Sequence, residues 1–397
     1  MNNVLLIVDA FYTANFNVML SVIKALDPDV IIHAVSMWGD AAPGNKDDSH
    51  IRYYSVRNSE MEFNNNIPKR MKSKASFYLN IFNTIKSSYF ISKDTKRAFQ
   101  KCEDIISDNG ITRVFSVFHP KYAHEVAIML CRKYPQIRNY QFWFDHFTNA
   151  NYNFNTLFRK LIGKYYINRI KKIERHYFQA AERIYALPEA FIDDAVIEDF
   201  KDKLILFEIP YVEKFECTVL SKDITFAGSF DSRFRNPLPV FDVILESIPL
   251  IEKDIEFKFF VNQPSDYANF ETISNGKMVF RGYLDRDGLK KQLSNSMMLM
   301  TIGNKGLTMM PSKTVEYVAY RKPILFFYAD DNDASKRYLD FYPDVCDIDL
   351  RKDKSENSIK LATFINSNHS SIIYEDLMKV DVYRKSTPEH IREIISF

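Results

Sequence analysis

One glutamate in the second half of the chain stands at helical spacing from a serine and a lysine. The stretch 311–325 reads PSKTVEYVAYRKPIL, in which Glu316 follows Ser312 by four residues and Lys313 by three. Residues three and four apart share one side of a helix. The carboxylate could accept hydrogen bonds from both hydroxyls of a diol. A serine at the N-cap and a lysine in the first turn would favour an anion. The alternative is an ordinary surface ion pair between the lysine and the glutamate.

Two arginines form a second candidate group. The stretch FAGSFDSRFRNP (226–237) reads as the end of a buried strand and a loop that carries Arg233 and Arg235. Arginine suits two-pronged contact with phosphate. The chain has only ten glycines and contains neither GxGxxG nor GxxxxGK[ST]. Phosphate binding would therefore need side chains and a helix N-terminus instead of a glycine-rich loop.

Polar residues also stand at the ends of two predicted strands in the first half. His119 ends the strand predicted over 112–119, and Asp145 and His146 lie at the end of the strand predicted over 140–145. Ligands of parallel sheets bind outside the carboxyl ends of the strands. One of these side chains could act as the general base for a hydroxyl group, and each could equally be a structural residue.

Alternating strands and helices must position these residues. Apolar runs alternate with helical periodicity along both halves, which is typical of a parallel sheet built from βαβ units, and the pattern restarts near residue 215. The sequence therefore predicts an α/β protein of two Rossmann-like, doubly wound domains that face a central cleft. The predicted strands cover 3–9, 30–38, 112–119, 140–145, 183–189, 202–212, 223–228, 255–262, 277–285, 297–303 and 324–328. The predicted helices cover 15–26, most of 68–107, 122–134, 155–182, 238–251, 287–296, the stretch that begins at 312, 336–342, 355–367 and 387–396, the last with Thr387 as its N-cap.

Bulk composition excludes several classes of protein. The chain has 397 residues, is 46% hydrophobic and carries a net charge of +2, which argues against a nucleic-acid binder. Its four cysteines lie far apart, so the spacing of a metal site is absent and a reducing, cytoplasmic setting is expected. The opening MNNVLLIVDAFY lacks the basic start of a signal peptide, and no apolar stretch approaches the length of a membrane span.

The second half resembles the nucleotide-sugar-binding domain of GT-B glycosyltransferases of the group 1, or family 4-like, type. The resemblance rests on three stretches in the family's order, which are FAGSFDSR (226–233), FRGYL (280–284) and PSKTVEYVAYRKPIL (311–325). In the first half only the βα pattern and ERIYALPEAF (182–191) are similar. The family architecture implies an acceptor-binding domain over 1–214, a donor-binding domain over 215–380 and a C-terminal helix over 381–397 that packs toward the first domain.

The resemblance implies a role for each residue of a donor site. Glu316 would accept hydrogen bonds from the two ribose hydroxyls, and Arg233 in preference to Arg235 would contact the pyrophosphate. His119 matches a histidine that faces the donor sugar in relatives. The other implied donor-site residues are Ser229, Ser312 and Lys313 near the phosphates, Gly282, Tyr283 and Leu284 near the nucleobase, and Gly303, Asn304 and Thr308 near the sugar.

Two residues depart from the family's pattern. Thr308 stands where many retaining members have a second glutamate that contacts the donor sugar, so this contact would be lost or made by backbone groups of 303–307. Arg321 stands where the family usually has glycine after the helix. A left-handed arginine would cost on the order of 1 kcal/mol, so the sequence favours a helix that ends in another way.

The predicted function is a hexosyltransferase-like glycosyltransferase, retaining or inverting, that uses a UDP- or GDP-linked sugar and needs no metal or other cofactor. Its acceptor would be a glycan or a lipid-linked oligosaccharide in bacterial surface polysaccharide synthesis. Two alternatives stay open. One is a GT-B-like protein that binds nucleotide or scaffolds partners without catalysis, and the other is a nucleotide-sugar epimerase, although 303–310 offers no acids or bases for it.

Two basic regions, 69–101 and 157–176, interleave lysine and arginine with aromatic and apolar residues. This pattern is compatible with docking on an anionic membrane, which would suit a lipid-linked acceptor and a place at the cytoplasmic face of the membrane. A solvated helix face is the alternative.

Overall fold

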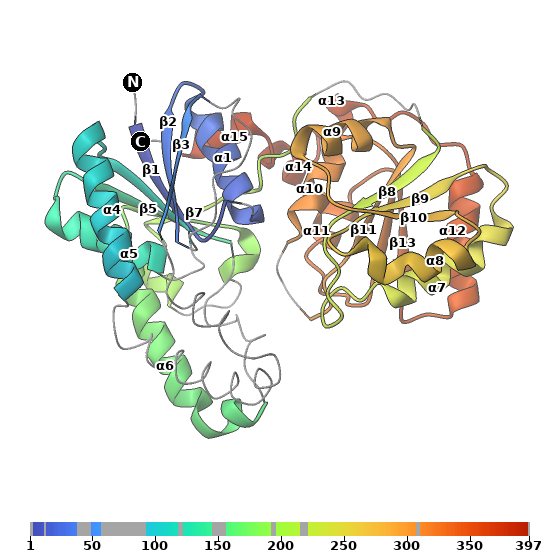
Figure 1. Ribbon diagram of the computed structural model, residues 1–397, viewed down its shortest axis with the longest axis horizontal. Coiled ribbons are helices and arrows are strands. Elements are labelled where there is room, and N and C mark those ends of the chain that lie inside the picture. The colour runs from blue at the N-terminus through green and yellow to red at the C-terminus, as the bar shows by residue number, and fades with distance from the viewer. Residues whose placement is uncertain are drawn as a thin grey trace. The chain divides into compact units, whose positions relative to one another are not determined.

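The chain divides into two compact units, one formed by Met1–Glu208 with Ile391–Phe397 and the other by Ile209–His390. Figure 1 shows the computed structural model. It describes residues 3–11, 13–37, 49–56, 93–117, 122–144, 156–191, 196–214, 221–306 and 310–395, with the side chains of 156–167 and 191 left aside.

The first unit is built on a parallel sheet of seven strands in the order β3-β2-β1-β4-β5-β6-β7. The chain moves outward from β1 to β3 and then returns to β4, so the order reverses between β1 and β4, as in a Rossmann sheet. The strands are β1 (Asn3–Val8), β2 (Ile31–Ser36), β3 (Ile51–Ser55), β4 (Arg113–Val117), β5 (Arg138–Trp143), β6 (Arg183–Ala186) and β7 (Leu204–Leu206).

Helices cover the first sheet with apolar faces. Helices α4 and α5 pack together over β1 and β4 through Cys102, Ile105, Val126 and Leu130, all buried. The C-terminal residues join this unit, since Arg392 Nε donates a hydrogen bond to the Ala25 carbonyl at 2.6 Å. The helices are α1 (Ala14–Leu26), α4 (Lys93–Asn109), α5 (Tyr122–Lys133) and α6 (Thr156–Ala180), with short 3₁₀ turns η3 (Pro188–Phe191) and η4 (Ile197–Phe200).

The second unit has a parallel sheet of six strands in the order β10-β9-β8-β11-β12-β13. The order reverses between β8 and β11, so their carboxyl ends flank the switch point at which doubly wound sheets bind ligands. The strands are β8 (Asp223–Ala227), β9 (Glu256–Phe260), β10 (Met278–Arg281), β11 (Met298–Ile302), β12 (Ile324–Tyr328) and β13 (Val345–Asp349). The fold class expected from the sequence, two Rossmann-like domains, is confirmed.

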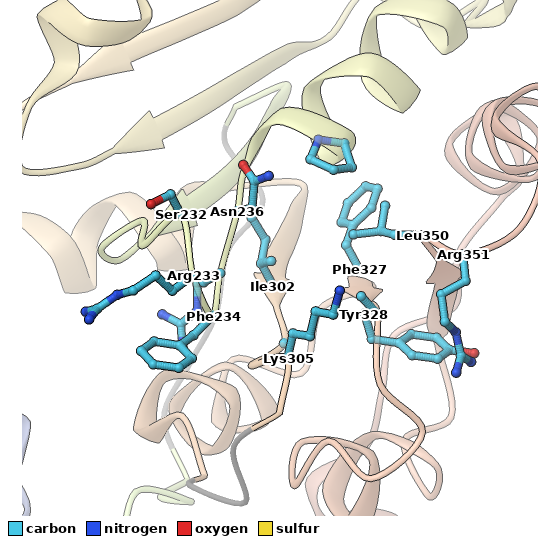
Figure 2. A pocket seen from close by; sticks show the side chains of 14 residues that line it. Ser232, Arg233, Phe234, Asn236, Ile302, Lys305, Phe327, Tyr328, Leu350 and Arg351 are labelled. Atoms are coloured by element: carbon cyan, nitrogen blue, oxygen red, sulfur yellow. The ribbon is translucent and has the colours of Figure 1, made fainter. Parts of the chain in front are cut away.

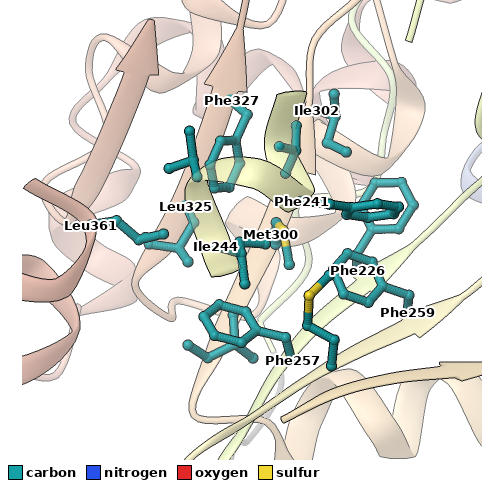
Figure 3. Packing of buried hydrophobic residues seen from close by; sticks show 14 of the residues in the cluster. Phe226, Phe241, Ile244, Phe257, Phe259, Met300, Ile302, Leu325, Phe327 and Leu361 are labelled. Atoms are coloured by element: carbon teal, nitrogen blue, oxygen red, sulfur yellow. The ribbon is translucent and has the colours of Figure 1, made fainter. Parts of the chain in front are cut away.

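The core of the second unit is rich in aromatic rings (Figure 3). Phe241, which is buried, lies 5.3 Å from the ring centroids of both Phe259 and Phe280. Residues Leu361 and Ile365 pack against the same cluster. The helices are α7 (Leu238–Ser247), α8 (Ala268–Ile273), α9 (Arg286–Asn295), α10 (Ser312–Ala319), α11 (Lys336–Leu339), α12 (Lys354–Asn366), α13 (Tyr374–Leu377), α14 (Asp381–Lys385) and α15 (Pro388–Ile394), with 3₁₀ turns η5 (Ile248–Leu250) and η6 (Pro264–Tyr267).

Two strands were not predicted from the sequence, and both lie at the edge of a sheet. β3 (IRYYS) lies at one edge of the first sheet, and β13 (VCDID) lies at one edge of the second. Arg52 in β3 and Asp347 in β13 are exposed, and these charged residues interrupt the continuous apolar run by which a buried parallel strand is recognised. The short helix α8 is also missed, because it has no buried residue and therefore no apolar stripe.

The start of α10 corrects one expectation. Ser312 is the first helical residue, and the N-cap is Pro311, whose extended backbone (φ −69°, ψ 115°) provides no side-chain cap. The Pro311 carbonyl accepts the Thr314 N–H at 2.9 Å, so the first turn closes on the proline backbone. The expected N-cap at Thr387 is confirmed, because its Oγ1 accepts the His390 N–H at 3.2 Å.

The end of α10 corrects a second expectation, because Arg321 is left-handed, with φ 52°. The Arg321 N–H bonds to the Val318 carbonyl at 3.1 Å, which closes the last turn. Directly afterwards the Lys322 side chain is buried and donates to the Ser296 carbonyl, and Pro323 cannot continue a helix. The chain must therefore reverse at Arg321, and a left-handed residue is the common way to do so.

Replacing Arg321 by glycine and by alanine separates the free-energy cost of the left-handed backbone from the loss of the arginine side chain. Both variants lose the arginine side chain, but only glycine relieves the left-handed strain, so Arg321→Gly should be more stable than Arg321→Ala by about 1 kcal/mol. Native-state hydrogen exchange of α10 and β12 measures the difference. Equal protection in the two variants would contradict the left-handed conformation.

Candidate functional site

Two loops meet at the switch point of the second unit. The loop after β8 carries Ser229, Arg233 and Arg235, and the loop after β11 carries Gly303 and Asn304. The Lys305 N–H donates to the Phe234 carbonyl at 2.7 Å and joins the loops directly. Five residues predicted to bind the donor therefore lie in two adjoining loops.

Arg235 is the cation that links these loops. Its Nη2 donates to Asn304 Oδ1 at 2.8 Å, its Nη1 reaches the Ser229 carbonyl at 3.4 Å, and its Nε is buried without a hydrogen-bond partner. Burial lowers the pKa of the guanidinium, and the nearby Asp333 carboxylate acts in the opposite direction. Both described acceptors are neutral, so Arg235 forms no ion pair among the described residues, although the Asp333 carboxylate lies near it.

A buried carboxylate fixes the second loop. Asp333 is 4% exposed, and its Oδ2 accepts the Asn304 N–H at 2.5 Å while its Oδ1 accepts the Ser335 N–H at 2.8 Å. Burial raises the pKa of this carboxyl group. Gly303 is required beside it, because a Cβ on Gly303 would stand 1.9 Å from Asp333 Oδ2. Asp333 was not predicted from the sequence, although the acidic run DDND (330–333), which follows the predicted strand 324–328 after one residue, was a usable signal.

Arg233 does not link the two loops and instead forms an ion pair within its own loop. Its guanidinium is bound to the Asp231 carboxylate, with Nη2 at 2.9 Å from Oδ2 and Nε at 3.2 Å from Oδ1, and the side chain is 66% exposed. The arginine holds the pKa of Asp231 at about 2. Arg235, rather than the arginine preferred from the sequence, is therefore the one that the structure brings against Asn304.

Helix α10 carries the serine, the lysine and the glutamate on one side, as its spacing predicts. Lys313 Nζ lies 2.6 Å from Glu316 Oε2, and the two side chains are 35% and 20% exposed. The ion pair between Lys313 and Glu316, which the sequence left open as the alternative, is therefore present. Within the described chain the second carboxylate oxygen, Oε1, has no partner, so the pair occupies one acceptor oxygen and leaves the other available.

The other face of α10 anchors it to the sheet. The Tyr317 hydroxyl accepts the Ala227 N–H at 3.0 Å at the end of β8, and Thr314 Oγ1 lies 3.3 Å from Thr301 Oγ1 on β11. All four residues are buried. Helix α10 therefore keeps a fixed position relative to the loop that carries Arg235.

The third predicted stretch follows β10. Gly282, Tyr283 and Leu284 form its loop, and Tyr283 exposes 59% of its surface. Desolvation raises the pKa of the Tyr283 hydroxyl while the charge of Arg235 lowers it. The loop ends where Asp285 Oδ1 accepts the Gly288 N–H at 2.7 Å and caps α9. An exposed ring on a capped loop offers a flat surface on which an aromatic ligand could stack.

A pocket of about 250 Å³ opens beside the Arg235 loop (Figure 2). It is formed by 232–236, by the ends of β11, β12 and β13, and by Pro239 in the first turn of α7. Its lining combines Phe327 and Leu350 with cationic and amide side chains. The pocket can therefore hold a group that is partly apolar and partly charged.

Four predicted residues, His119, Asp145, His146 and Thr308, lie outside the described residues. Within the described ranges no group of three or more histidine, cysteine, aspartate or glutamate side chains could hold a metal ion. No described helix combines the length and the hydropathy needed to cross a membrane.

Comparison with solved structures places this architecture among known folds. The chain superposes on a UDP-GlcNAc 2-epimerase from Methanocaldococcus jannaschii with a TM-score of 0.56 and 11% identity, over 99% of each chain. The chain has the GT-B fold. A Staphylococcus aureus TarM mutant in complex with fondaparinux, alpha-GlcNAc-glycerol and UDP gives a TM-score of 0.56 at 11% identity, over 99% of this chain and 98% of that one. A glycosyltransferase from Rickettsia africae gives 0.51 at 11% identity, over 99% and 93%.

These likenesses establish the GT-B fold and not a reaction, because the identities are so low. The family 4-like subtype expected from the sequence stays a prediction, since neither a family model nor a curated protein matches the chain.

Replacing Gly303 by alanine should disrupt the loop. The added Cβ would collide with the Asp333 carboxylate, and displacing this buried group should destabilise the second unit by about 2–4 kcal/mol. Native-state hydrogen exchange of the segment 298–306 measures the loss. Gly282→Ala is the matched control, because a Cβ there meets open space. Equal effects of the two variants would contradict the described loop geometry.

Proposed function

We propose that this chain is a glycosyltransferase that uses a nucleotide-diphosphate sugar. The observation that carries the proposal is Arg235, a partly buried cation without a carboxylate partner among the described residues, at the switch point of a GT-B donor domain. The switch point is where such a sheet binds its ligand, and arginine suits a phosphate.

The remaining donor contacts follow from the neighbouring elements. Glu316 would use Oε1 to accept a ribose hydroxyl, while Lys313 holds Oε2 and so orients the carboxylate. The backbone N–H groups at the start of α10 would add to the attraction for the pyrophosphate. Tyr283 would stack on the nucleobase, which is uracil or guanine in the two donors considered. No metal is needed in this arrangement, since arginine and lysine supply the positive charge.

The chemistry itself would depend on residues of the first half and of the 303–308 loop. His119, Asp145 and His146 remain the proposed general bases or sugar contacts, and Thr308 would replace a carboxylate at the sugar. The acceptor would be a glycan or a lipid-linked oligosaccharide. The cationic residues of α6, such as Arg169, Lys171 and Lys172, would support docking on an anionic membrane at its cytoplasmic face.

A second candidate is a nucleotide-sugar epimerase, because UDP-GlcNAc 2-epimerases are among the solved structures with this fold. The third is a protein that binds nucleotide without catalysis. Transfer and hydrolysis over a panel of UDP- and GDP-sugars, followed by sugar analysis, separates them. Sugar transfer supports our proposal, a changed sugar on intact nucleotide supports the epimerase, and inactivity with normal nucleotide binding supports the non-catalytic protein.

Glu316→Ala should remove recognition of the ribose diol. Wild-type protein should bind UDP or GDP about tenfold more tightly than the matching 2′-deoxynucleotide, as expected for a hydrogen bond to a charged group. The variant should bind both nucleotides equally, with an unchanged far-ultraviolet circular dichroism spectrum. Isothermal titration calorimetry provides the affinities.

Lys313→Ala is the control for Glu316→Ala, because it breaks the ion pair and keeps the carboxylate. It should retain discrimination against the deoxynucleotide. If Glu316→Ala also retains it, the glutamate does not bind the ribose and the pair with Lys313 is its whole role.

Arg235→Lys and Arg233→Lys should differ. Lysine cannot reproduce the planar fork, so the change at Arg235 should weaken UDP or GDP binding about tenfold and leave the unphosphorylated nucleoside unaffected. The change at Arg233 should alter both affinities less than about twofold, because this side chain is bound to Asp231 at the surface. A larger effect at Arg233 would restore the preference drawn from the sequence, and no effect at either would exclude both from the phosphate site.

A further inference from the structure

The pocket beside the Arg235 loop is lined by four cations, and no described carboxylate lines it. The cations are Arg233, Arg235, Lys305 and Arg351, which come from the loops after β8, β11 and β13. At about 250 Å³ the pocket is smaller than the roughly 300–1,000 Å³ of pockets that enclose a whole ligand. It therefore suits one anionic group of a larger ligand.

Two of the four cations are already balanced. Arg233 is bound to Asp231, as described above. Arg351 donates to both oxygens of Asp331 at 2.7 Å and to Asp349 at 2.8 and 2.7 Å. These arginines shape the wall of the pocket, but their charges are compensated within the protein.

The other two cations form no ion pair with a described carboxylate. Arg235 bonds to the neutral acceptors Asn304 and Ser229. Lys305 is fixed through its backbone N–H, and among the described residues its ammonium group has no hydrogen bond or ion pair. Figure 2 shows the Lys305 side chain extending toward Tyr328 inside the pocket. A ligand carboxylate would supply the partner that this ammonium group lacks.

Neutral groups complete the pocket. Asn236 Oδ1 accepts the Leu238 N–H at 3.2 Å, which leaves its amide hydrogens to donate, and the Ser232 hydroxyl lies on the same loop. Phe234, Pro239 and Leu350, none of them fully buried, add apolar surface to the lining. A cation and an amide donor beside apolar surface match a sugar ring that bears a carboxylate, since the carbon face of the ring can pack on that surface.

We propose that this pocket binds the carboxylate of an acidic sugar, with Lys305 as its cation, so that the donor is a nucleotide-linked uronic acid. The inference rests on the proposed function and adds the class of sugar that is transferred. Lys305 follows Gly303 by two residues and lies in the loop next to Arg235, so a donor held at Arg235 through its phosphates would have its sugar near this pocket.

Matched pairs of donors test the inference. Affinities of wild type, Lys305→Met and Lys305→Arg are measured by calorimetry for UDP, UDP-glucose and UDP-glucuronate, and for GDP, GDP-mannose and GDP-mannuronate. In at least one series wild type should bind the uronate roughly five- to tenfold more tightly than the neutral sugar, which is the range of one partly exposed charge-assisted hydrogen bond. Lys305→Met should abolish this preference and change the affinity for the free nucleotide less than about twofold, and Lys305→Arg should restore most of it.

Lys291→Met is the matched control, because it removes the same charge from an exposed position on α9 that does not line the pocket. It should leave the preference intact. Wild type that does not prefer the uronate overturns the inference. So does a Lys305→Met variant that loses UDP or GDP as strongly as the uronate donor, because the lysine would then serve the pyrophosphate. Failure of every nucleotide to bind wild type would instead contradict the proposed function itself, and the uronate donor with it.

Discussion

The reversal of strand order between β8 and β11 is the constraint on which the second unit depends. All strands of this sheet run parallel, so every connecting loop that leaves a carboxyl end gathers at one edge. At the reversal, the loops leave toward opposite faces of the sheet and a crevice remains between them. Arg235 and Asn304 join the two loops across this point, and Tyr317 ties α10 to the end of β8. The loop that carries Arg235, helix α10 with Glu316 and the loop that carries Tyr283 are therefore all positioned by the carboxyl-end edge of one sheet.

The sequence allowed the fold and the location of the candidate site to be predicted, because buried parallel strands are apolar runs that need no partner to be recognised. It could not decide between Arg233 and Arg235, which differ by two residues. Their difference comes from Asp231, which binds the first at the surface, and from Asn304, which lies 69 residues along the chain from the second. The role of Asp333 depends on a distant residue in the same way, since its side chain accepts the backbone N–H of Asn304.

The ends of α10 show where local signals were misleading. A serine before an apolar helix is a good N-cap by preference, yet the cap position falls on Pro311 because its extended backbone already closes the first turn. The arginine at 321 is a poor left-handed residue, yet the buried Lys322 and the rigid Pro323 leave the chain no other turn. At Pro311 a local hydrogen bond to Thr314 fixes the backbone, whereas at Arg321 the tertiary contact of the next residue, Lys322, does so.

The contact between Gly303 and Asp333 also constrains how this protein can change over evolution. No side chain fits at position 303 while the carboxylate at 333 accepts the backbone N–H of Asn304. The two positions are therefore expected to vary together. A descendant that gains a side chain at 303 must first exchange the aspartate for a smaller residue and find another acceptor for that N–H. A side chain at 303 is compatible with this loop only after the aspartate is lost, so the glycine should persist wherever the aspartate does.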